Sequence, residues 1–255
     1  MAKALKGKVA VITGGGTGIG QAIARRFAAE GCKVVVAGRR KEPLDKVAKA
    51  IGGRAIPTDV TDEASVRALF KACDKAYGRL DVLVANAGIA GPIAPAEKLN
   101  MEEFDEAVAI NIRGTILCIK YAVPLLKRRR GGSIITMSSK MGFVGYPNRS
   151  TYTATKFAIN GMTLACAQEL GPLGIRVNSL CPGHVSGDLM KRTIAKRAKV
   201  EGLSVAKTKA IYYENVAALR KWVEPEEVAA AALFLASSES SAITGDFLKV
   251  DAGRV

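Results

Sequence analysis

A tyrosine and a lysine four residues apart are the pair in this sequence best suited to chemistry. Tyr152 and Lys156 lie in the segment Tyr-Thr-Ala-Thr-Lys, which continues into a helical pattern that ends near Gly171. A spacing of four places both side chains on one face of a helix, one turn apart. A phenol is a weak acid at neutral pH, and a neighbouring ammonium favours its ionised form. The pair therefore predicts a group that donates and accepts a proton, whereas an isolated Tyr-x-x-x-Lys is most often a surface pair.

A glycine-rich segment near the start of the chain predicts a site for a phosphorylated ligand. It reads Thr-Gly-Gly-Gly-Thr-Gly-Ile-Gly over residues 13–20 and follows an apolar strand pattern over 8–13. Glycine permits the sharp turn and the close approach of backbone to a pyrophosphate, and the N-terminus of the helix that follows attracts an anion. The residues of this segment that we expect to contact a dinucleotide are Gly14, Gly16, Thr17, Gly18, Ile19 and Gly20.

The end of the second predicted strand bears on which dinucleotide is bound. Sites of this type usually have an acid there, about 20 residues after the turn, which binds the ribose hydroxyls. This sequence has Arg39 and Arg40 instead. An arginine fork can clamp a 2′-phosphate that an acid would repel, whereas the alternative role of Arg39 is a solvated loop charge. We predict NADP(H) in preference to NAD(H).

The pattern of elements predicts an α/β fold. Apolar strand patterns at 33–37, 82–85, 133–137 and 176–180 alternate with amphipathic stretches of helix length. Strands separated by helices form a parallel sheet with right-handed crossovers. We expect residues 1–255 to form a single Rossmann-like domain of three layers, around a doubly wound, mainly parallel sheet of seven strands that ends at 247–250. The basic, helical segment 186–222 interrupts the alternation after a strand, which predicts a lid over the substrate.

Composition narrows the class of protein. The five cysteines form no Cys-x-x-Cys pair, so we expect neither disulfides nor a metal site. A leader segment and an apolar stretch of about 18 uncharged residues are both missing, which predicts a cytoplasmic protein without a membrane partner. The net charge of +15 raises the hypothesis of a nucleic-acid binder. The cluster at 127–130 lies where a helix should end, however, so the positive balance fits an anionic cofactor or substrate better than nucleic acid.

Further motifs turn these observations into a family resemblance. Asn86-Ala87-Gly88 follows the strand pattern at 82–85, Asn111 lies further on, Ser139 comes thirteen residues before Tyr152, and Pro182-Gly183 follows the strand pattern at 176–180. In their order and spacing these motifs resemble those of the short-chain dehydrogenase/reductase family, in its branch of about 250 residues, nearly from end to end.

The resemblance implies catalytic roles. Tyr152 would donate a proton to a carbonyl oxygen during reduction and accept it during oxidation, and Lys156 would favour the ionised tyrosine and hold the nicotinamide ribose. Ser139 would hydrogen-bond the substrate oxygen. Asn111 would hold a water that links Lys156 to solvent. Ser138 is expected to support the strand end rather than to take part in chemistry.

The resemblance also implies cofactor contacts outside the glycine turn. Asp59 and Val60 would contact the adenine. The other positions expected along the cofactor are Asn86, Ala87, Gly88, Tyr152, Lys156, Pro182, Gly183 and Val185.

Three residues depart from the family pattern or invite another role. Gly187 stands where the family usually has a threonine that bonds the nicotinamide amide or a phosphate, so Ser186 or the backbone would have to replace it. Thr17 stands where some NADP-binding members have a basic residue, which leaves discrimination to Arg39 and Arg40. His184 invites the role of general base because histidine titrates near neutrality, but Tyr152 already fills that role.

The function that follows is hydride transfer between C4 of a nicotinamide and a ketone, aldehyde or alcohol. The substrate would be a small molecule, with an anionic one favoured by the positive charge, and a 3-oxoacyl thioester, a polyol and a hydroxy acid all fit. The resemblance implies a homotetramer. The alternative is a regulatory protein that senses NADPH without turnover, which the intact set of Asn111, Ser139, Tyr152 and Lys156 disfavours.

Overall fold

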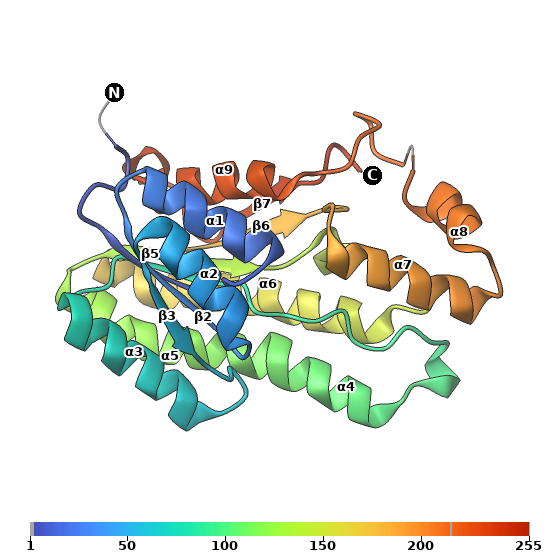
Figure 1. Ribbon diagram of the computed structural model, residues 1–255, viewed down its shortest axis with the longest axis horizontal. Coiled ribbons are helices and arrows are strands. Elements are labelled where there is room, and N and C mark those ends of the chain that lie inside the picture. The colour runs from blue at the N-terminus through green and yellow to red at the C-terminus, as the bar shows by residue number, and fades with distance from the viewer. Residues whose placement is uncertain (1–2, 215, 255) are drawn as a thin grey trace.

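A parallel seven-stranded sheet runs through the centre of the computed structural model, which describes residues 3–214 and 216–254 (Figure 1). The strand order is β3-β2-β1-β4-β5-β6-β7, so the direction of winding reverses between β1 and β4. Ile12 in β1 is aligned with Val36 of β2 on one side and with Val84 of β4 on the other. The predicted doubly wound sheet is confirmed. The strands are β1 (Val9–Thr13), β2 (Lys33–Gly38), β3 (Arg54–Pro57), β4 (Val82–Ala85), β5 (Gly132–Met137), β6 (Ile175–Pro182) and β7 (Phe247–Val250).

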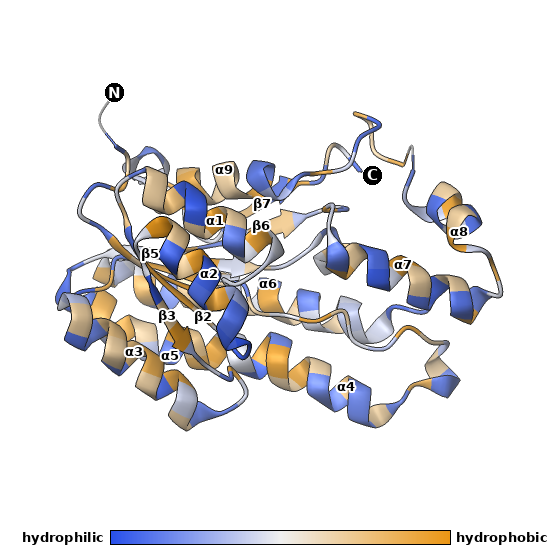
Figure 2. Cartoon of the chain, viewed as in Figure 1, coloured by the Kyte–Doolittle hydropathy of each residue, from blue (hydrophilic) through white to orange (hydrophobic). Residues whose placement is uncertain are grey.

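Helices cover both faces of the sheet and explain why its strands are apolar on both sides. Helices α1, α2 and α9 lie on one face, and α3, α5 and α6 lie on the other (Figure 1). Ala10 and Ile12 pack toward the first group, while Val9 and Val11 pack toward the second. Figure 2 shows the same pattern as apolar strands between helices of mixed hydropathy. The helices are α1 (Gly18–Ala29), α2 (Lys41–Ile51), α3 (Glu63–Tyr77), α4 (Met101–Val108), α5 (Gly114–Arg128), α6 (Ser150–Leu170), α7 (Asp188–Glu201), α8 (Val205–Tyr212) and α9 (Pro225–Ala236).

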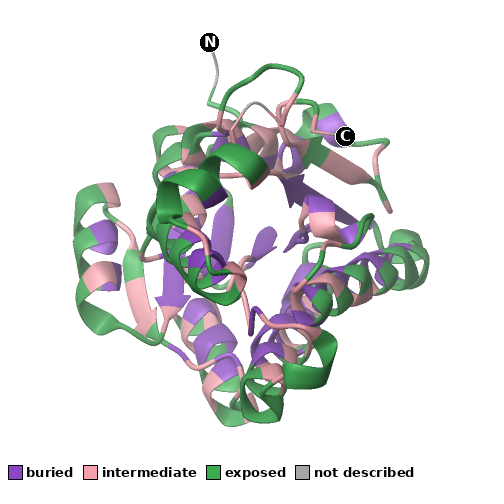
Figure 3. Cartoon of the chain, turned by 90° about the vertical axis from the view of Figure 1, so that its right-hand side faces the viewer, coloured by how far each residue is buried: buried purple, intermediate pink, exposed green. Residues whose placement is uncertain are grey.

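Helices α7 and α8 extend past the end of β6, on the right in Figure 1. Figure 3 shows the molecule from that side, with buried strands at the centre and exposed helix faces around them. Arg197 links the two helices. Its Nε donates to Glu201 Oε1 at 2.9 Å, and its guanidinium lies 3.4 Å from the centroid of the Tyr212 ring. The segment 186–222 therefore holds two helices fastened to each other, and its role as a lid stays a prediction.

Helices α4 and α5 are joined by a π-helical turn, Ala109–Arg113, into one continuous helix. Among the described residues this helix, Met101–Arg128, alone has the length and composition that could cross a membrane, and 44% of its apolar window is buried. Leu117, Ala122 and Leu126 of α5 belong to the core beside the sheet. The apolarity of this helix is that of a core helix.

Candidate active site

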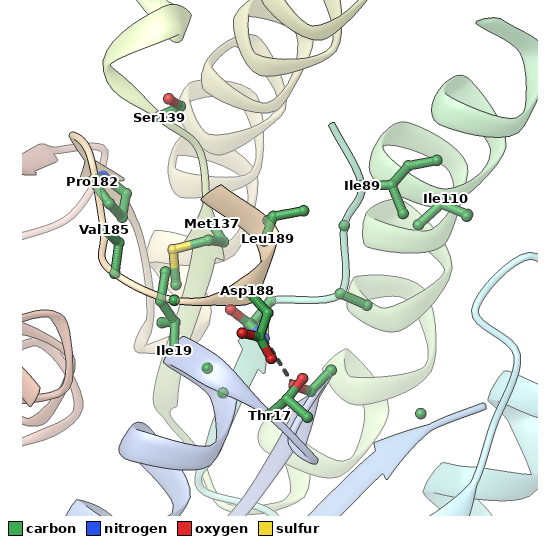
Figure 4. A pocket seen from close by; sticks show the side chains of 18 of the residues that line it. Thr17, Ile19, Ile89, Ile110, Met137, Ser139, Pro182, Val185, Asp188 and Leu189 are labelled. Carbon is green, nitrogen blue, oxygen red and sulfur yellow. Dashed lines mark hydrogen bonds between the residues drawn. The ribbon is translucent and has the colours of Figure 1, made fainter. Parts of the chain in front are cut away.

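A cleft of about 480 Å³ opens where the strand order reverses, a volume typical of sites for small molecules and cofactors. Its walls come from the turn between β1 and α1, from the ends of β2, β4 and β5, from α6, and from the segment 182–192. Figure 4 shows Thr17 and Ser139 at opposite ends of the cleft, with Met137, Val185 and Asp188 between them. The topology thus gathers segments that are far apart in the sequence.

The predicted cofactor residues lie in the walls of this cleft, with one difference at Gly16. A Cβ atom at Gly16 would lie 3.2 Å from Cβ of Pro43, so this glycine faces α2. Its observed role is close packing of α2 against the turn, which does not require contact with a ligand. Wall residues that were not singled out from the sequence include Gly38, Thr58, Ile89, Ile110 and Met137. The wall also contains four residues of the segment predicted as a lid: Asp188, Leu189, Met190 and Arg192.

The N-terminus of α1 is suited to bind an anion because no side chain caps it. Thr17, the N-cap residue, makes no capping hydrogen bond, and the first turn contains no acid. Helix α3 differs, because the carboxylate of Asp62 accepts hydrogen bonds from the backbone N–H groups of Ala64 at 3.0 Å and Ser65 at 3.1 Å. The N–H groups at the start of α1 therefore face the cleft without a side-chain partner, which fits a pyrophosphate.

Thr13, a residue that sequence analysis missed, fastens the glycine turn to the end of β4. Its Oγ1 accepts hydrogen bonds from the backbone N–H of Asn86 at 3.0 Å and of Ala87 at 3.1 Å. Asn86 Nδ2 donates to the carbonyl of Thr13 at 2.9 Å. Gly14 has a φ of +64°, and a Cβ there would lie 2.8 Å from Asn86 Nδ2, so only glycine fits. A threonine at the end of an apolar strand was the available signal.

At the end of the cleft lined by Thr17, Arg39 and Arg40 are exposed, and Asp59 lies near Arg39. Arg40 Nη2 approaches Thr17 Oγ1 at 3.5 Å. Asp59 Oδ1 accepts hydrogen bonds from the N–H and the hydroxyl of Thr61. The N–H bond from Thr61, assisted by the charge of Arg39, lowers the pKa of Asp59 below its ordinary value. Asp59 is therefore ionised, and its charge partly offsets that of Arg39.

The predicted catalytic side chains meet at the other end of the cleft. Helix α6 begins at Ser150 and carries Tyr152 and Lys156 on consecutive turns. Lys156 Nζ lies 5.3 Å from the centroid of the Tyr152 ring and donates to the carbonyl of Met137 at 2.8 Å. This bond fixes the ammonium beside the phenol. Ser139 and Tyr152 line the cleft together.

Ser138 has the supporting position expected for it. It is buried, and its hydroxyl donates to the carbonyl of Lys156 at 3.2 Å. Its backbone N–H donates to the carbonyl of Leu180 at 2.8 Å. Both Ser138 and Ser139 line the cleft, but the hydroxyl of Ser138 is used to join the end of β5 to α6.

A second cation beside Tyr152 had no signal in the sequence. Arg149 precedes α6, and its guanidinium lies 4.8 Å from the centroid of the Tyr152 ring. Arg149 and Lys156 are both buried. Two buried cations therefore lie close to the ring of Tyr152.

Asn111 is a fully buried positioning residue in the π-helical turn. Its Oδ1 accepts from the N–H of Ile89 at 2.8 Å, and its Nδ2 donates to the carbonyl of Ile89 at 3.0 Å and to Thr155 Oγ1 at 3.1 Å. These bonds join the loop after β4 to α6. Both amide hydrogens of Asn111 are used within the protein, so a water could only donate a hydrogen bond to an oxygen of this residue. The proton relay through such a water stays a prediction.

The segment after β6 shows how the departures from the family pattern are accommodated. Gly187 lines the cleft with a φ of +130°, a conformation that disfavours the usual threonine. The hydroxyl of Ser186 donates to the carboxylate of Glu224. With that hydroxyl engaged elsewhere, the backbone of this segment is the better substitute for the threonine.

His184 is held neutral by its surroundings. Its Nδ1 lies 2.7 Å from Arg254 Nη1. Burial, together with the charge of Arg254, lowers the pKa of His184 to about 3. The ring therefore carries no second proton near neutrality, in agreement with the assignment of acid and base chemistry to Tyr152.

Comparisons with known proteins relate the chain to reductases and dehydrogenases. The family model described as enoyl-(acyl carrier protein) reductase matches residues 14–254. A 3-oxoacyl-[acyl-carrier-protein] reductase of Thermotoga maritima is 36% identical over 98% of this chain and 99% of its own length. A cis-4-hydroxycyclohexanecarboxylate dehydrogenase of Sinomonas cyclohexanicum is 38% identical over 99% of this chain and 98% of its own.

Solved structures give the same result in three dimensions. The crystal structure of levodione reductase matches with a TM-score of 0.91 and 30% identity, covering 97% of both chains. That of 3-ketoacyl-(acyl-carrier-protein) reductase from Brucella melitensis complexed with NADH has a TM-score of 0.88 and 36% identity, covering 98% of this chain and 99% of the other. Because sequence and fold agree over nearly its whole length, the chain belongs to the short-chain dehydrogenase/reductase family and is an oxidoreductase that acts on alcohols or ketones with a nicotinamide cofactor.

Proposed function

We propose that the enzyme is an NADP(H)-dependent reductase of a ketone that also oxidises the corresponding secondary alcohol. The observation that carries this proposal is the position of Tyr152, with Ser139 and Lys156, at one end of a cleft whose other end is the uncapped N-terminus of α1. The cleft thus has an anion-binding end and an acid–base end.

In the proposed reaction the bound dinucleotide supplies or takes up a hydride at C4 of its nicotinamide. Ser139 Oγ donates a hydrogen bond to the substrate oxygen, and Tyr152 Oη gives that oxygen a proton during reduction. Lys156, fixed by the carbonyl of Met137, holds the nicotinamide ribose and stabilises the phenolate that remains. In oxidation the same groups act in reverse.

The proposed preference for NADP(H) rests on Arg39. It is exposed at the end of β2 and lines the cleft, where a 2′-phosphate can accept hydrogen bonds from its guanidinium. The relative from Brucella melitensis was solved with NADH, so NAD(H) is the competing assignment. Comparing the two cofactors directly decides between them.

The relatives favour a substrate with a secondary hydroxyl or a ketone. Their names specify a 3-oxoacyl chain on a carrier protein, a cyclic hydroxycarboxylate and levodione. A 3-oxoacyl thioester, a polyol and a hydroxy acid are therefore the classes to test first.

We also propose that the enzyme forms a homotetramer in the cytoplasm. Phe157 and Leu164 on α6 are 48% and 49% exposed, and Ile116 on α5 is 39% exposed. Apolar side chains left open on neighbouring helices favour association with further copies. The five cysteines are free and buried, as suits a reducing compartment.

The test is a panel of carbonyls and alcohols, assayed at 340 nm with NADPH or NADP⁺ and with NADH or NAD⁺. We expect turnover that prefers the phosphorylated cofactor and is absent in the Tyr152→Phe variant. Cofactor binding without turnover of any substrate would favour a regulatory protein that senses NADPH. Equal activity of wild type and Tyr152→Phe would contradict the proposed chemistry.

A further inference from the structure

A smaller cavity of about 80 Å³ adjoins the catalytic end of the cleft. It shares Ser139, Tyr152 and Gly183 with the larger cleft. A substrate whose reacting carbon lies at Ser139 and Tyr152 would therefore place its remaining atoms here. This volume is roughly half that of an apolar cavity of about 150 Å³ that binds benzene, so it suits a group of only a few non-hydrogen atoms.

Three cationic side chains line this small cavity: Lys140, Arg149 and Arg254. They come from the loop after β5, the residue before α6, and the C-terminal segment. Lys140 is 8% exposed and Arg149 is 4% exposed. Lys140 Nζ and Arg149 Nη1 are buried and have no hydrogen-bond partner. Burial lowers the pKa of both Arg149 and Arg254, as expected for cations removed from water without an anionic partner.

None of the described residues that line the cavity is acidic, so no carboxylate in its wall balances this charge. Glu201, at the end of α7, does not line the cavity; its Oε1 pairs with Arg197, and its buried Oε2 has no hydrogen-bond partner. The two groups that bond Arg254 are neutral: Nδ1 of His184 and the carbonyl of Tyr212. The cavity wall therefore keeps uncompensated positive charge.

Buried cations without partners are costly, and an anion that enters the cavity removes that cost. Charge-assisted hydrogen bonds from Lys140 Nζ and Arg149 Nη1 would then satisfy both orphan donors at once. A neutral hydroxyl could accept one of these bonds but would leave the charge uncompensated. The cavity is thus better suited to an oxyanion than to the hydroxyl of a polyol.

We infer that this cavity binds the oxyanion head group of a compact substrate whose carbonyl carbon lies at Tyr152 and Ser139. This inference rests on the proposed function and names its substrate class: a small oxo acid or hydroxy acid, bearing a carboxylate or a phosphate, rather than a neutral polyol or a long acyl thioester. In the oxidation the secondary alcohol loses a hydride to the oxidised cofactor and its hydroxyl proton to Tyr152, and the product is the oxo acid. The anionic group takes part only in binding.

The first test compares three alcohols of similar size in the wild-type enzyme: 3-hydroxybutyrate, glycerol 3-phosphate and neutral butane-1,3-diol. We expect kcat/KM for one of the two anions to exceed that for the diol by at least about 100-fold, because a site built for a polar group rejects an analogue that lacks it. The carboxylate and phosphate arms then identify the head group. A diol that is used as well as both anions would overturn the inference.

The second test changes the cavity wall with Lys140→Met and Arg149→Met. Removing one partner of a buried charge pair should lower the ratio of kcat/KM for the anion to that for the diol by about 30-fold or more. Lys71→Met is the matched control, because Lys71 is an exposed lysine on α3. A ratio unchanged in both cavity variants would contradict the inference.

A third test measures binding without turnover. Trp222 is the only tryptophan, and its ring centroid lies 5.8 Å from that of His184 and 6.2 Å from that of Tyr213, two residues of the cavity wall. Malonate or inorganic phosphate should change its fluorescence saturably, and neutral malonamide should not. This wild-type measurement decides the inference even if the cavity variants fold poorly.

The outcomes separate this inference from the proposed function. Turnover of the neutral diol alone, with no fluorescence response to malonate or phosphate, would refute the oxyanion site and leave the reductase assignment intact. Anion binding at Trp222 without hydride transfer to any substrate would refute the reductase assignment and leave the oxyanion site intact.

Discussion

The two ends of the cleft present positive charge in opposite ways. At the cofactor end Arg39 and Arg40 are exposed, and the anion-binding groups are backbone N–H donors at the start of α1. At the substrate end Lys140 and Arg149 are buried, and two of their nitrogen atoms lack partners. An exposed cation is already solvated by water, so it only adjusts the affinity for a ligand that other groups bind. A buried cation without a partner lacks hydrogen bonds until an anionic ligand supplies them. Substitutions at the first end should therefore change the affinity for the cofactor by degrees, whereas substitutions at the second end should change the discrimination between anionic and neutral substrates.

The largest effect is expected at Tyr152, at the end of the cleft opposite the start of α1. Tyr152→Phe removes the acid–base group, and kcat should fall by about 10³-fold because positioned proton transfer contributes about 10²- to 10⁴-fold. The NADPH dissociation constant should change less than about threefold, since the phenol is one of many cofactor contacts. Steady-state kinetics and fluorescence titration measure the two quantities. A fall in binding equal to the fall in kcat would show that Tyr152 acts in binding alone.

Arg39 tests the exposed end. Arg39→Glu should raise the NADPH dissociation constant about 10- to 100-fold, the range for losing a hydrogen bond to a charged group. NADH binding should change less than about threefold, because NADH lacks the 2′-phosphate. Arg25→Glu, an exposed change of the same charge on α1, is the control. Equal weakening of both cofactors by Arg39→Glu would remove the basis for the proposed NADP(H) preference.

His184 tests the buried end through the pH dependence of stability. Its pKa is about 3 in the folded protein and ordinarily 6.5, so between these values the unfolded chain binds a proton that the folded chain does not. The free energy of unfolding should therefore fall as pH drops from about 6.5 toward 3, by up to about 1.4 kcal/mol per pH unit. Urea unfolding of wild type and His184→Gln at pH 7, 6 and 5 isolates this contribution as their difference. Parallel pH profiles would show that His184 is not held neutral.

The smallest expected effect is on the free energy of unfolding, and it compares the capped N-terminus of α3 with the uncapped N-terminus of α1. Asp62→Ala should lower the free energy of unfolding by about 1 kcal/mol, because the carboxylate caps α3. Thr17→Ala should change it by less than about 0.5 kcal/mol, because Thr17 makes no capping bond to α1. Urea unfolding without cofactor measures both. A larger loss for Thr17→Ala would mean that α1 depends on this side chain.

The cofactor end could be predicted from the sequence because its signals are local. The glycine turn, the strand before it and the helix after it occupy about 20 consecutive residues, and Tyr152 and Lys156 are neighbours on one helix. Local spacing was enough to predict the glycine turn, whereas the roles of Tyr152 and Lys156 also needed the family resemblance. The short strand β3, none of whose four residues is buried, gave a weaker pattern and received no predicted bounds.

The substrate end could not be predicted because its residues meet only in the folded chain. Lys140, Arg149 and Arg254 lie in three segments that β5, β6 and the C-terminal residues bring together. In the sequence each is one cation among 38, and most of these lie in water. Asn111 was found through the family pattern, but its bonds to Ile89 and Thr155 depend on the packing of the π-helical turn against α6. Burial, which sequence spacing does not reveal, distinguishes these residues.

A crystal structure of the enzyme with NADP⁺ would show directly where the dinucleotide binds. We expect the pyrophosphate at the N-terminus of α1, the 2′-phosphate in contact with Arg39, and the Tyr152 hydroxyl and Lys156 Nζ both facing the nicotinamide ribose. A nicotinamide ring remote from Tyr152, or a dinucleotide bound outside this cleft, would contradict this expectation.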